Sequence, residues 1–170
     1  MAAGNTYTAI ATQTLGSAAA SVTFSSISGA YTDLVLIVSA GNDTNQRDML
    51  MQVNGDTASN YSYTYLTGSG SAASSGRGSG ATSYLCNWNA PLAAPSTLYS
   101  EYRINLLNYS NTTTYKTFLE RADNGATGYG TDAIVGLWRS TSAITSILLK
   151  PSAYNFATGS TFTLYGILAA

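Results

Sequence analysis

Histidine is absent from this 170-residue sequence, and cysteine occurs once, at Cys86. Without histidine, the chain lacks the usual general base near neutral pH, the commonest metal ligand and every Ser-His-Asp arrangement. One cysteine has no imidazole partner as a nucleophile, and by itself forms neither an intrachain disulfide nor a zinc site. We therefore predict no enzyme activity, no cofactor and no metal, and interpret Cys86 as a buried apolar residue in a strand.

Charge is also scarce. Charged residues make up 9% of the sequence, against about 25% in an average globular domain. The net charge is −1, and the seven Lys and Arg residues are scattered, so the clustered cations that nucleic-acid or polybasic membrane binding requires are missing. No apolar run has the length that crosses a bilayer, and residues 1–5 lack the features of a signal peptide. We predict no nucleic-acid partner, no membrane partner and synthesis in a cytoplasm.

Paired carboxylates are the catalytic device that remains, because glycosidases place two of them across a cleft. The two glutamates, Glu101 and Glu120, lie in predicted strands beside Arg103 and Arg121. We interpret them as cross-strand ion pairs on a solvated face. A glycosidase is expected only if both carboxyls lie within about 10 Å of each other in a cleft. Residues 43–48 lack the glycine and terminal glutamate of a calcium loop, and we interpret them as a turn held by Asx side chains.

What the sequence does contain is the period-two alternation of β-strands. This pattern predicts strands near residues 6–15, 22–27, 33–38, 47–53, 61–66, 99–109, 115–121, 133–139, 144–149 and 161–168. Their spacing is close to the roughly 8–12 residues that is typical of sandwiches and barrels. We predict one all-β domain over residues 1–170. It is expected to be an antiparallel two-sheet β-sandwich, jelly-roll-like, with eight to ten strands.

Tyrosine is abundant, with thirteen residues. Tyr61, Tyr63 and Tyr65 alternate with other residues, so the three phenols share one face of their strand. Tyrosines either fill sheet faces and corners or supply contact area for interfaces and sugars. Residues 68–83 are almost entirely Gly, Ser and Ala and predict a long flexible loop, because they bury too little apolar area to offset their backbone entropy. We expect Tyr61, Tyr63 and Tyr65, beside this loop, to form a contact surface.

Several short motifs resemble a β-sandwich module of tailed-bacteriophage virion proteins, which occurs in capsid cement (decoration) proteins and in tail fibres. The motifs are NGDTASNYS at 54–62, NYS at 108–110 with KT at 116–117, AITSI at 143–147 and GSTFTLYGI at 159–167. The resemblance implies a jelly-roll-like fold, no catalysis, and work done through self-association and contact with other virion proteins. The matching residues look like fold determinants: a hairpin turn, a corner tyrosine and a terminal strand.

Within this resemblance, the architecture distinguishes cement from fibre. A tail fibre joins such a module to coiled-coil or β-helical shaft segments, and this sequence shows neither pattern. We expect a whole small protein. The resemblance implies a homotrimeric capsid cement protein that binds the major capsid protein at the capsid surface of the virion, after synthesis in the host bacterial cytoplasm. The alternative is a tail-fibre or receptor-binding module that recognises host surface glycans through tyrosine platforms.

Overall fold

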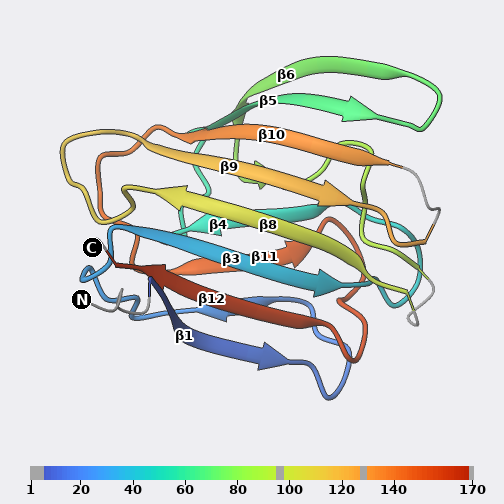
Figure 1. Ribbon diagram of the computed structural model, residues 1–170, viewed down its shortest axis with the longest axis horizontal. Helices are drawn as coiled ribbons and strands as arrows, with labels where there is room; N and C mark the ends of the chain where they lie inside the picture. The colour runs from blue at the N-terminus through green and yellow to red at the C-terminus, as the bar shows by residue number, and fades with distance from the viewer. Residues whose placement is uncertain (1–5, 95–97, 127–129, 169–170) are drawn as a thin grey trace.

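The computed structural model describes residues 6–94, 98–126 and 130–168. Within these ranges the chain is all β, and its strands form two antiparallel sheets (Figure 1). In this view the larger sheet faces the reader and the smaller sheet lies behind it. The predicted two-sheet antiparallel β-sandwich is confirmed. Among these residues, no helix has the length and apolar character needed to span a bilayer.

Twelve strands are formed in the described ranges, more than the eight to ten predicted. The chain alternates between the sheets from β1 to β5, and strands far apart in sequence become neighbours, which is jelly-roll-like. The larger sheet has the order β1 (Tyr7–Thr14), β12 (Thr161–Ile167), β3 (Asp33–Ala40), β8 (Ser100–Leu107), β9 (Lys116–Asp123), β10 (Thr131–Trp138), β5 (Tyr61–Gly68) and β6 (Ala73–Ala81). The smaller sheet has the order β2 (Val22–Phe24), β11 (Ile147–Pro151), β4 (Met49–Val53) and β7 (Tyr84–Leu85).

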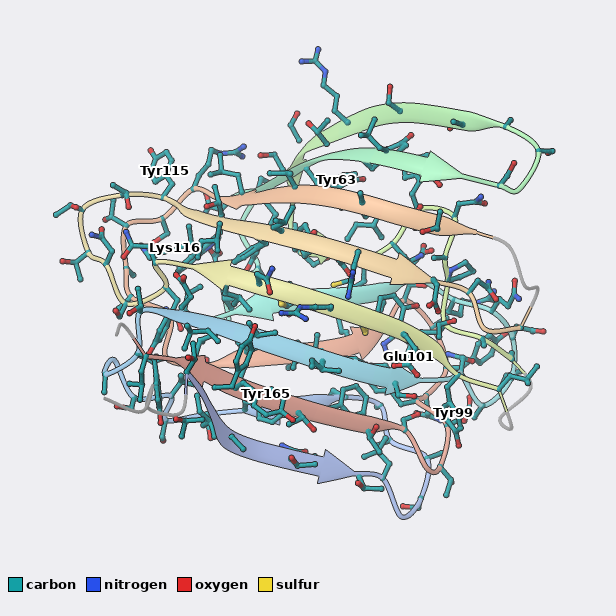
Figure 2. All side chains as sticks on the ribbon, in the orientation of Figure 1. Tyr63, Tyr99, Glu101, Tyr115, Lys116 and Tyr165 are labelled. Atoms are coloured by element: carbon teal, nitrogen blue, oxygen red, sulfur yellow. The ribbon has the colours of Figure 1, made fainter. Side chains whose placement is uncertain are left out.

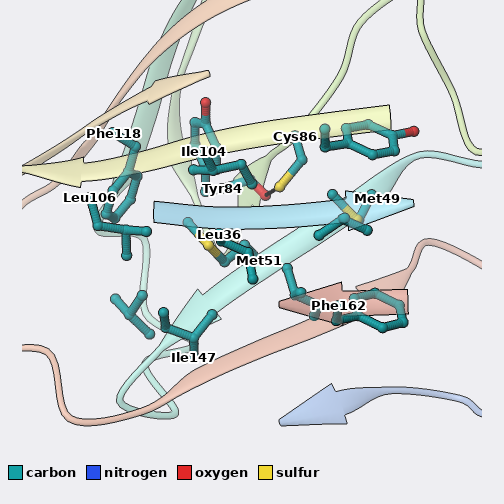
Figure 3. Packing of buried hydrophobic residues seen from close by; sticks show 14 of the residues in the cluster. Leu36, Met49, Met51, Tyr84, Cys86, Ile104, Leu106, Phe118, Ile147 and Phe162 are labelled. Carbon is teal, nitrogen blue, oxygen red and sulfur yellow. Dashed lines mark hydrogen bonds between the residues drawn. The ribbon is translucent and has the colours of Figure 1, made fainter. Parts of the chain in front are cut away.

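The hydrophobic core fills the space between the sheets (Figure 3). Strand alternation sends every second side chain inward, and in β9 this produces a strict succession of buried and exposed residues. Leu36 and Phe118 from the larger sheet and Met51 and Ile147 from the smaller one are all fully buried. Cys86 is buried as predicted, directly after β7.

The loop predicted over residues 68–83 is wrong, because Ala73–Ala81 form the strand β6, which pairs with β5. In this register Tyr63 lies opposite Gly78 and Tyr65 lies opposite Gly76. Each tyrosine ring lies across its glycine: a Cβ atom added to Gly78 would stand 2.5 Å from Tyr63 Cζ, and one added to Gly76 would stand 2.6 Å from Tyr65 Cζ. An aromatic ring that covers a glycine of the neighbouring strand supplies the packing that the glycine lacks.

Two of the motifs that resemble phage virion proteins hold distant segments together. The predicted turn forms at Asn54, whose side-chain Nδ2 donates to the carbonyl of Ala143 at 2.7 Å. The hairpin expected at this turn is wrong, because β4 and β5 on either side belong to different sheets. The corner tyrosine is Tyr109, which is fully buried and whose hydroxyl donates to the carbonyl of Ser28. Asn54 and Tyr109 therefore each connect two segments that are distant in the sequence.

The tyrosine–glycine packing is tested by Gly78→Ala. We expect this variant to lower the free energy of unfolding by about 1–3 kcal/mol, because the new methyl group displaces the Tyr63 ring. Urea unfolding measures the change, and Ser79→Ala, at an exposed neighbouring position, is the matched control. The cost should vanish when Tyr63 is replaced by alanine. If Gly78→Ala still lowers the free energy of unfolding in the Tyr63→Ala variant, the loss of stability does not come from contact with the Tyr63 ring.

Candidate functional site

The contact surface predicted from Tyr61, Tyr63 and Tyr65 is wrong. The three phenols share one face of β5, but that face turns inward: Tyr61 is 0% exposed, Tyr65 is 8% exposed, and Tyr63 is half-buried. The hydroxyl of Tyr61 accepts the N–H of Val53 at 3.0 Å. Burial raises the pKa of Tyr61 to about 12. Alternation predicted the shared face correctly, but not which side of the sheet it occupies.

The two glutamates do not come together in a cleft. Glu101 is exposed on β8 (Figure 2), whereas Glu120 on β9 points into the core and is 2% exposed. Their side chains therefore leave opposite faces of the larger sheet, so the glycosidase arrangement of these acids is not formed. The ion pair expected for Glu120 is also wrong, because neither of its carboxyl oxygens has a hydrogen-bond partner.

Glu120 belongs to a cluster of buried titratable side chains between the sheets. Burial raises the pKa of its carboxyl well above the ordinary value, and the charge of Asp132 adds to this effect. Tyr84 lies close enough to lower this pKa somewhat, yet its hydroxyl completes no hydrogen bond. Burial and the neighbouring Glu120 likewise raise the pKa values of Tyr84 and Cys86. Burial therefore disfavours the charged forms of Glu120, Tyr84 and Cys86.

Asp132 on β10 fixes the segment that follows β7. Its Oδ2 atom accepts three backbone N–H groups, from Trp88 at 2.6 Å and from Asn89 and Ala90 at 2.9 Å each. The carboxylate is 2% exposed. In this position Trp88 stacks on Tyr65, with ring centroids 4.2 Å apart and an interplanar angle of 15°, and remains 49% exposed. The sequence contains no signal for this arrangement, because the groups that bind Asp132 belong to the backbone.

The outer face of the larger sheet, turned away from the smaller sheet, exposes several large apolar side chains. Sheet faces in contact with water normally carry polar side chains. This face instead carries large apolar side chains that are 38% to 64% exposed: Tyr7, Ile37, Leu66, Leu107, Leu119 and Val135. Val135 pairs directly with Leu119, and Leu66 on β5 lies opposite Ala133, two residues from Val135 along β10. We name Leu66, Leu119 and Val135 the apolar cluster.

Three arginines surround the apolar cluster on the outer face. Arg77 and Val135 line a hollow of about 520 Å³, and Leu119 lines a second hollow of about 340 Å³ together with Arg103 and Arg121. An apolar centre with arginine at its margin is typical of protein–protein interfaces. The sequence did not reveal this site, because its members come from five strands.

Arg103 and Arg121 lie directly opposite each other on β8 and β9. Like charges in this position are destabilising. The Arg103 Nη2 atom donates to the hydroxyl of Tyr7 at 2.8 Å, and Glu101 and Asp123 line one hollow together with both arginines. Two adjacent guanidinium groups on an open face favour a partner that brings carboxylates.

The segment at residues 43–48 is a turn held by Asx side chains, as interpreted from the sequence. The Oδ1 atom of Asn42 accepts the N–H of Thr44 at 3.1 Å, and Asp43 accepts the side-chain amide of Asn155 at 2.9 Å. That amide holds the pKa of Asp43 below its usual value. In the part of the chain that the structure describes, no group of three or more His, Cys, Asp or Glu side chains is placed to hold a metal ion.

No protein-family model matches the sequence, and no curated protein matches it. Among solved structures, galectin LEC-6 from Caenorhabditis elegans is 9% identical with a TM-score of 0.37, and the alignment covers 98% of this chain and 99% of that chain. A protein of unknown function from Shewanella oneidensis MR-1 is 8% identical with a TM-score of 0.22, covering 100% of this chain and 82% of that chain. Likeness at this level supports no conclusion about function.

The buried carboxyl of Glu120 gives stability a defined pH dependence. The folded-state pKa of Glu120 lies above the ordinary value of 4.5. The contribution of this carboxyl to the free energy of unfolding is therefore fully present below pH 4.5 and is lost as the pH rises through the folded-state pKa. The loss is at most about 1.4 kcal/mol per pH unit. We expect Glu120→Gln to be more stable than the wild type at about pH 8, with a difference that shrinks toward about pH 4.

Chemical unfolding across this pH range measures the effect. Glu101→Gln is the matched control for loss of a carboxylate, at an exposed position. An equal pH dependence in the wild type and Glu120→Gln would contradict the role of Glu120.

The Asp132 carboxylate is tested by Asp132→Ala. We expect a loss of about 3 kcal/mol, because three backbone N–H groups lose a charged acceptor. Release of the segment should also change the fluorescence of Trp88, measured with Trp138 replaced by phenylalanine. The control is Asp123→Ala, since Asp123 accepts the single exposed N–H of Glu101. Unchanged fluorescence in Asp132→Ala would show that the carboxylate does not position Trp88.

Proposed function

We propose that this chain is a virion structural protein of a tailed bacteriophage, a capsid cement protein that binds and stabilises the shell of the major capsid protein. The observation that carries the proposal is the apolar cluster with its arginine margin on an otherwise open sheet face. The resemblance of the sequence motifs to phage virion proteins suggests the major capsid protein as the partner.

The geometry suits a protein partner better than a small ligand. The apolar cluster and its arginines extend over β8, β9, β10, β5 and β6, so a partner must cover several strands to contact all of them. Specific protein interfaces bury about 800 Å² on each partner, an area that a broad sheet face offers. The expected partner surface has an apolar centre and carboxylates opposite Arg77, Arg103 and Arg121.

Low overall charge supports many copies side by side. With only 9% charged residues, neighbouring copies on a lattice repel one another weakly. A protein that binds the assembled shell but not its separated subunits stabilises the shell by mass action. Many such contacts add up across a capsid even when each is weak.

The alternative, recognition of host surface glycans by a tail module, has one observation in its favour. Trp88 is 49% exposed and is stacked on the buried ring of Tyr65, and an exposed indole held in place supplies a platform for an amphipathic ligand. This platform differs from the one expected from the sequence, because Tyr61 and Tyr65 are buried. Glycan binding that is abolished by Trp88→Ala would favour the alternative.

Capsid docking is tested by Leu119→Glu with Val135→Glu, at two directly paired positions in the apolar cluster. We expect capsid affinity to fall at least about tenfold, because two charges enter the centre of the interface. The matched control is Thr14→Glu with Thr161→Glu, a directly paired couple at the far end of the same sheet. Co-sedimentation with capsids measures binding, which should also weaken as salt rises. Equal binding by both double variants, or no binding by the wild type, would contradict the proposal.

A further inference from the structure

Strand β6 forms an open edge of the larger sheet. It is nine residues long and pairs with β5 on one side, and Figure 1 shows it at the upper margin of the sheet. Natural proteins protect such edges with proline, lysine, bulges or covering segments, because unpaired backbone groups recruit another strand. Residues 73–79 contain no proline and no lysine, and their register with β5 is uninterrupted.

The other edge strand, β1, is protected. Its register with β12 shifts between Ala9 and Ala11, which marks a bulge, and bulges bend an edge away from pairing. In β6 the register shift falls only at the end of the strand, opposite Tyr61 and Ser62. The straight part of β6 therefore runs from Ala73 to Ser79.

The hairpin turn determines which backbone groups of β6 point outward. Ser69 and Ala72 continue the register of β5 and β6, and the N–H of Ser69 donates to the carbonyl of Ala72 at 2.9 Å. Hydrogen-bonded and non-hydrogen-bonded pairs alternate along antiparallel strands. Ser74, Gly76 and Gly78 therefore bond to β5. The N–H and carbonyl groups of the alternate residues point to the free edge: Ala73, Ser75, Arg77 and Ser79.

We propose that two copies of this chain pair through β6, antiparallel and across a two-fold axis that passes at Gly76. Gly76 is the midpoint of the straight segment, so this register uses every free-edge group from Ala73 to Ser79. Ser75 of one copy then forms a hydrogen-bonded pair with Arg77 of the second copy, and Ala73 pairs with Ser79 in the same way. The two eight-stranded sheets become one continuous sheet.

The residues of β6 at the two-fold axis and next to it are compatible with this register. Gly76 faces Gly76 of the second copy in a non-hydrogen-bonded pair, where Cα atoms approach to about 4.5 Å and small residues pack best. Arg77, the one charged residue of β6, faces a serine rather than the other arginine, which avoids direct like-charge pairing.

The aromatic side chains next to β6 favour a second copy of this chain as the partner that pairs with its free edge. The Tyr65 ring extends beneath Gly76, so its hydroxyl reaches the strand that carries the axis. Trp88 stacks on this ring and is 49% exposed. The two-fold axis brings the same pair of the second copy toward it, and tryptophan and tyrosine are the residues that contribute most to interface energy.

A two-fold axis perpendicular to the sheet keeps both outer faces on the same side. Because the apolar cluster includes Leu66 on β5, next to β6, two clusters then flank the axis and form one doubled docking surface. The pairing itself does not depend on capsid binding. It gives a dimer, in contrast to the trimer implied by the resemblance.

Amide hydrogen exchange of the full chain, followed by NMR over a range of protein concentrations, tests the pairing. We expect the N–H groups of Ser74, Gly76 and Gly78 to be protected at every concentration. Those of Ser75, Arg77 and Ser79 should become protected, by at least about tenfold, only as light scattering shows the dimer forming. Unprotected Ser75, Arg77 and Ser79 amides in the oligomer would overturn the proposal, as would a monomer at all concentrations or a trimer.

Ser75→Pro supplies the matched variant test. Ser75→Pro removes one N–H group that points to the free edge and leaves the hydrogen bonds between β6 and β5 intact. Edge strands tolerate proline at such a position. Ser75→Ala keeps the N–H group and is the control. We expect the dissociation constant of the dimer to rise at least about tenfold in Ser75→Pro and to stay near the wild-type value in Ser75→Ala. Unfolding of the monomer at low concentration verifies that both variants are folded. Equal dimerisation by a folded Ser75→Pro variant would refute β6 pairing while leaving capsid docking through the outer face untouched.

Discussion

The mismatch between a sheet of eight strands and a sheet of four governs this fold. The smaller sheet ends at β7, which lies against β5 and β10, so the inner side of β6 must be covered in another way. Tyr63 and Tyr65 provide the cover by lying across Gly78 and Gly76. This packing makes a regular strand from a glycine- and serine-rich segment and leaves an aromatic pair, Tyr65 with Trp88, at the margin of the sandwich.

The same mismatch explains where interaction surfaces arise. Only one face of each sheet contributes to the core, so within the described ranges no second sheet covers the outer face of the larger sheet. The apolar cluster lies at the β5–β10 end of that face, close to the free edge of β6. Low charge elsewhere leaves these two features as the principal sources of attraction. Inside the sandwich, burial raises the pKa of Glu120 well above its ordinary value, so the neutral form of this carboxyl is favoured in the core.

Sequence alternation was sufficient to predict the sandwich and the positions of most of its strands, because burial on one face imposes period two directly. It could not assign faces: Tyr61 and Glu120 have the periodicity of strand residues, but which side they occupy depends on the partner sheet. Strand β6 was missed because its stability comes from rings on β5. The spacing of Gly76 and Gly78 matches that of Tyr65 and Tyr63, which is a signal visible only when both segments are considered as neighbours. The outer-face site combines residues from distant strands and has no local signature.

We propose that this chain acts at the surface of a capsid through the outer face of its larger sheet. Cryo-electron microscopy of phage particles that contain this chain would locate it on the particle. We expect density for the chain on the capsid exterior, with Leu66, Leu119 and Val135 turned toward the major capsid protein. Density confined to the tail, or a capsid-bound chain whose outer face is turned toward solvent, would contradict it.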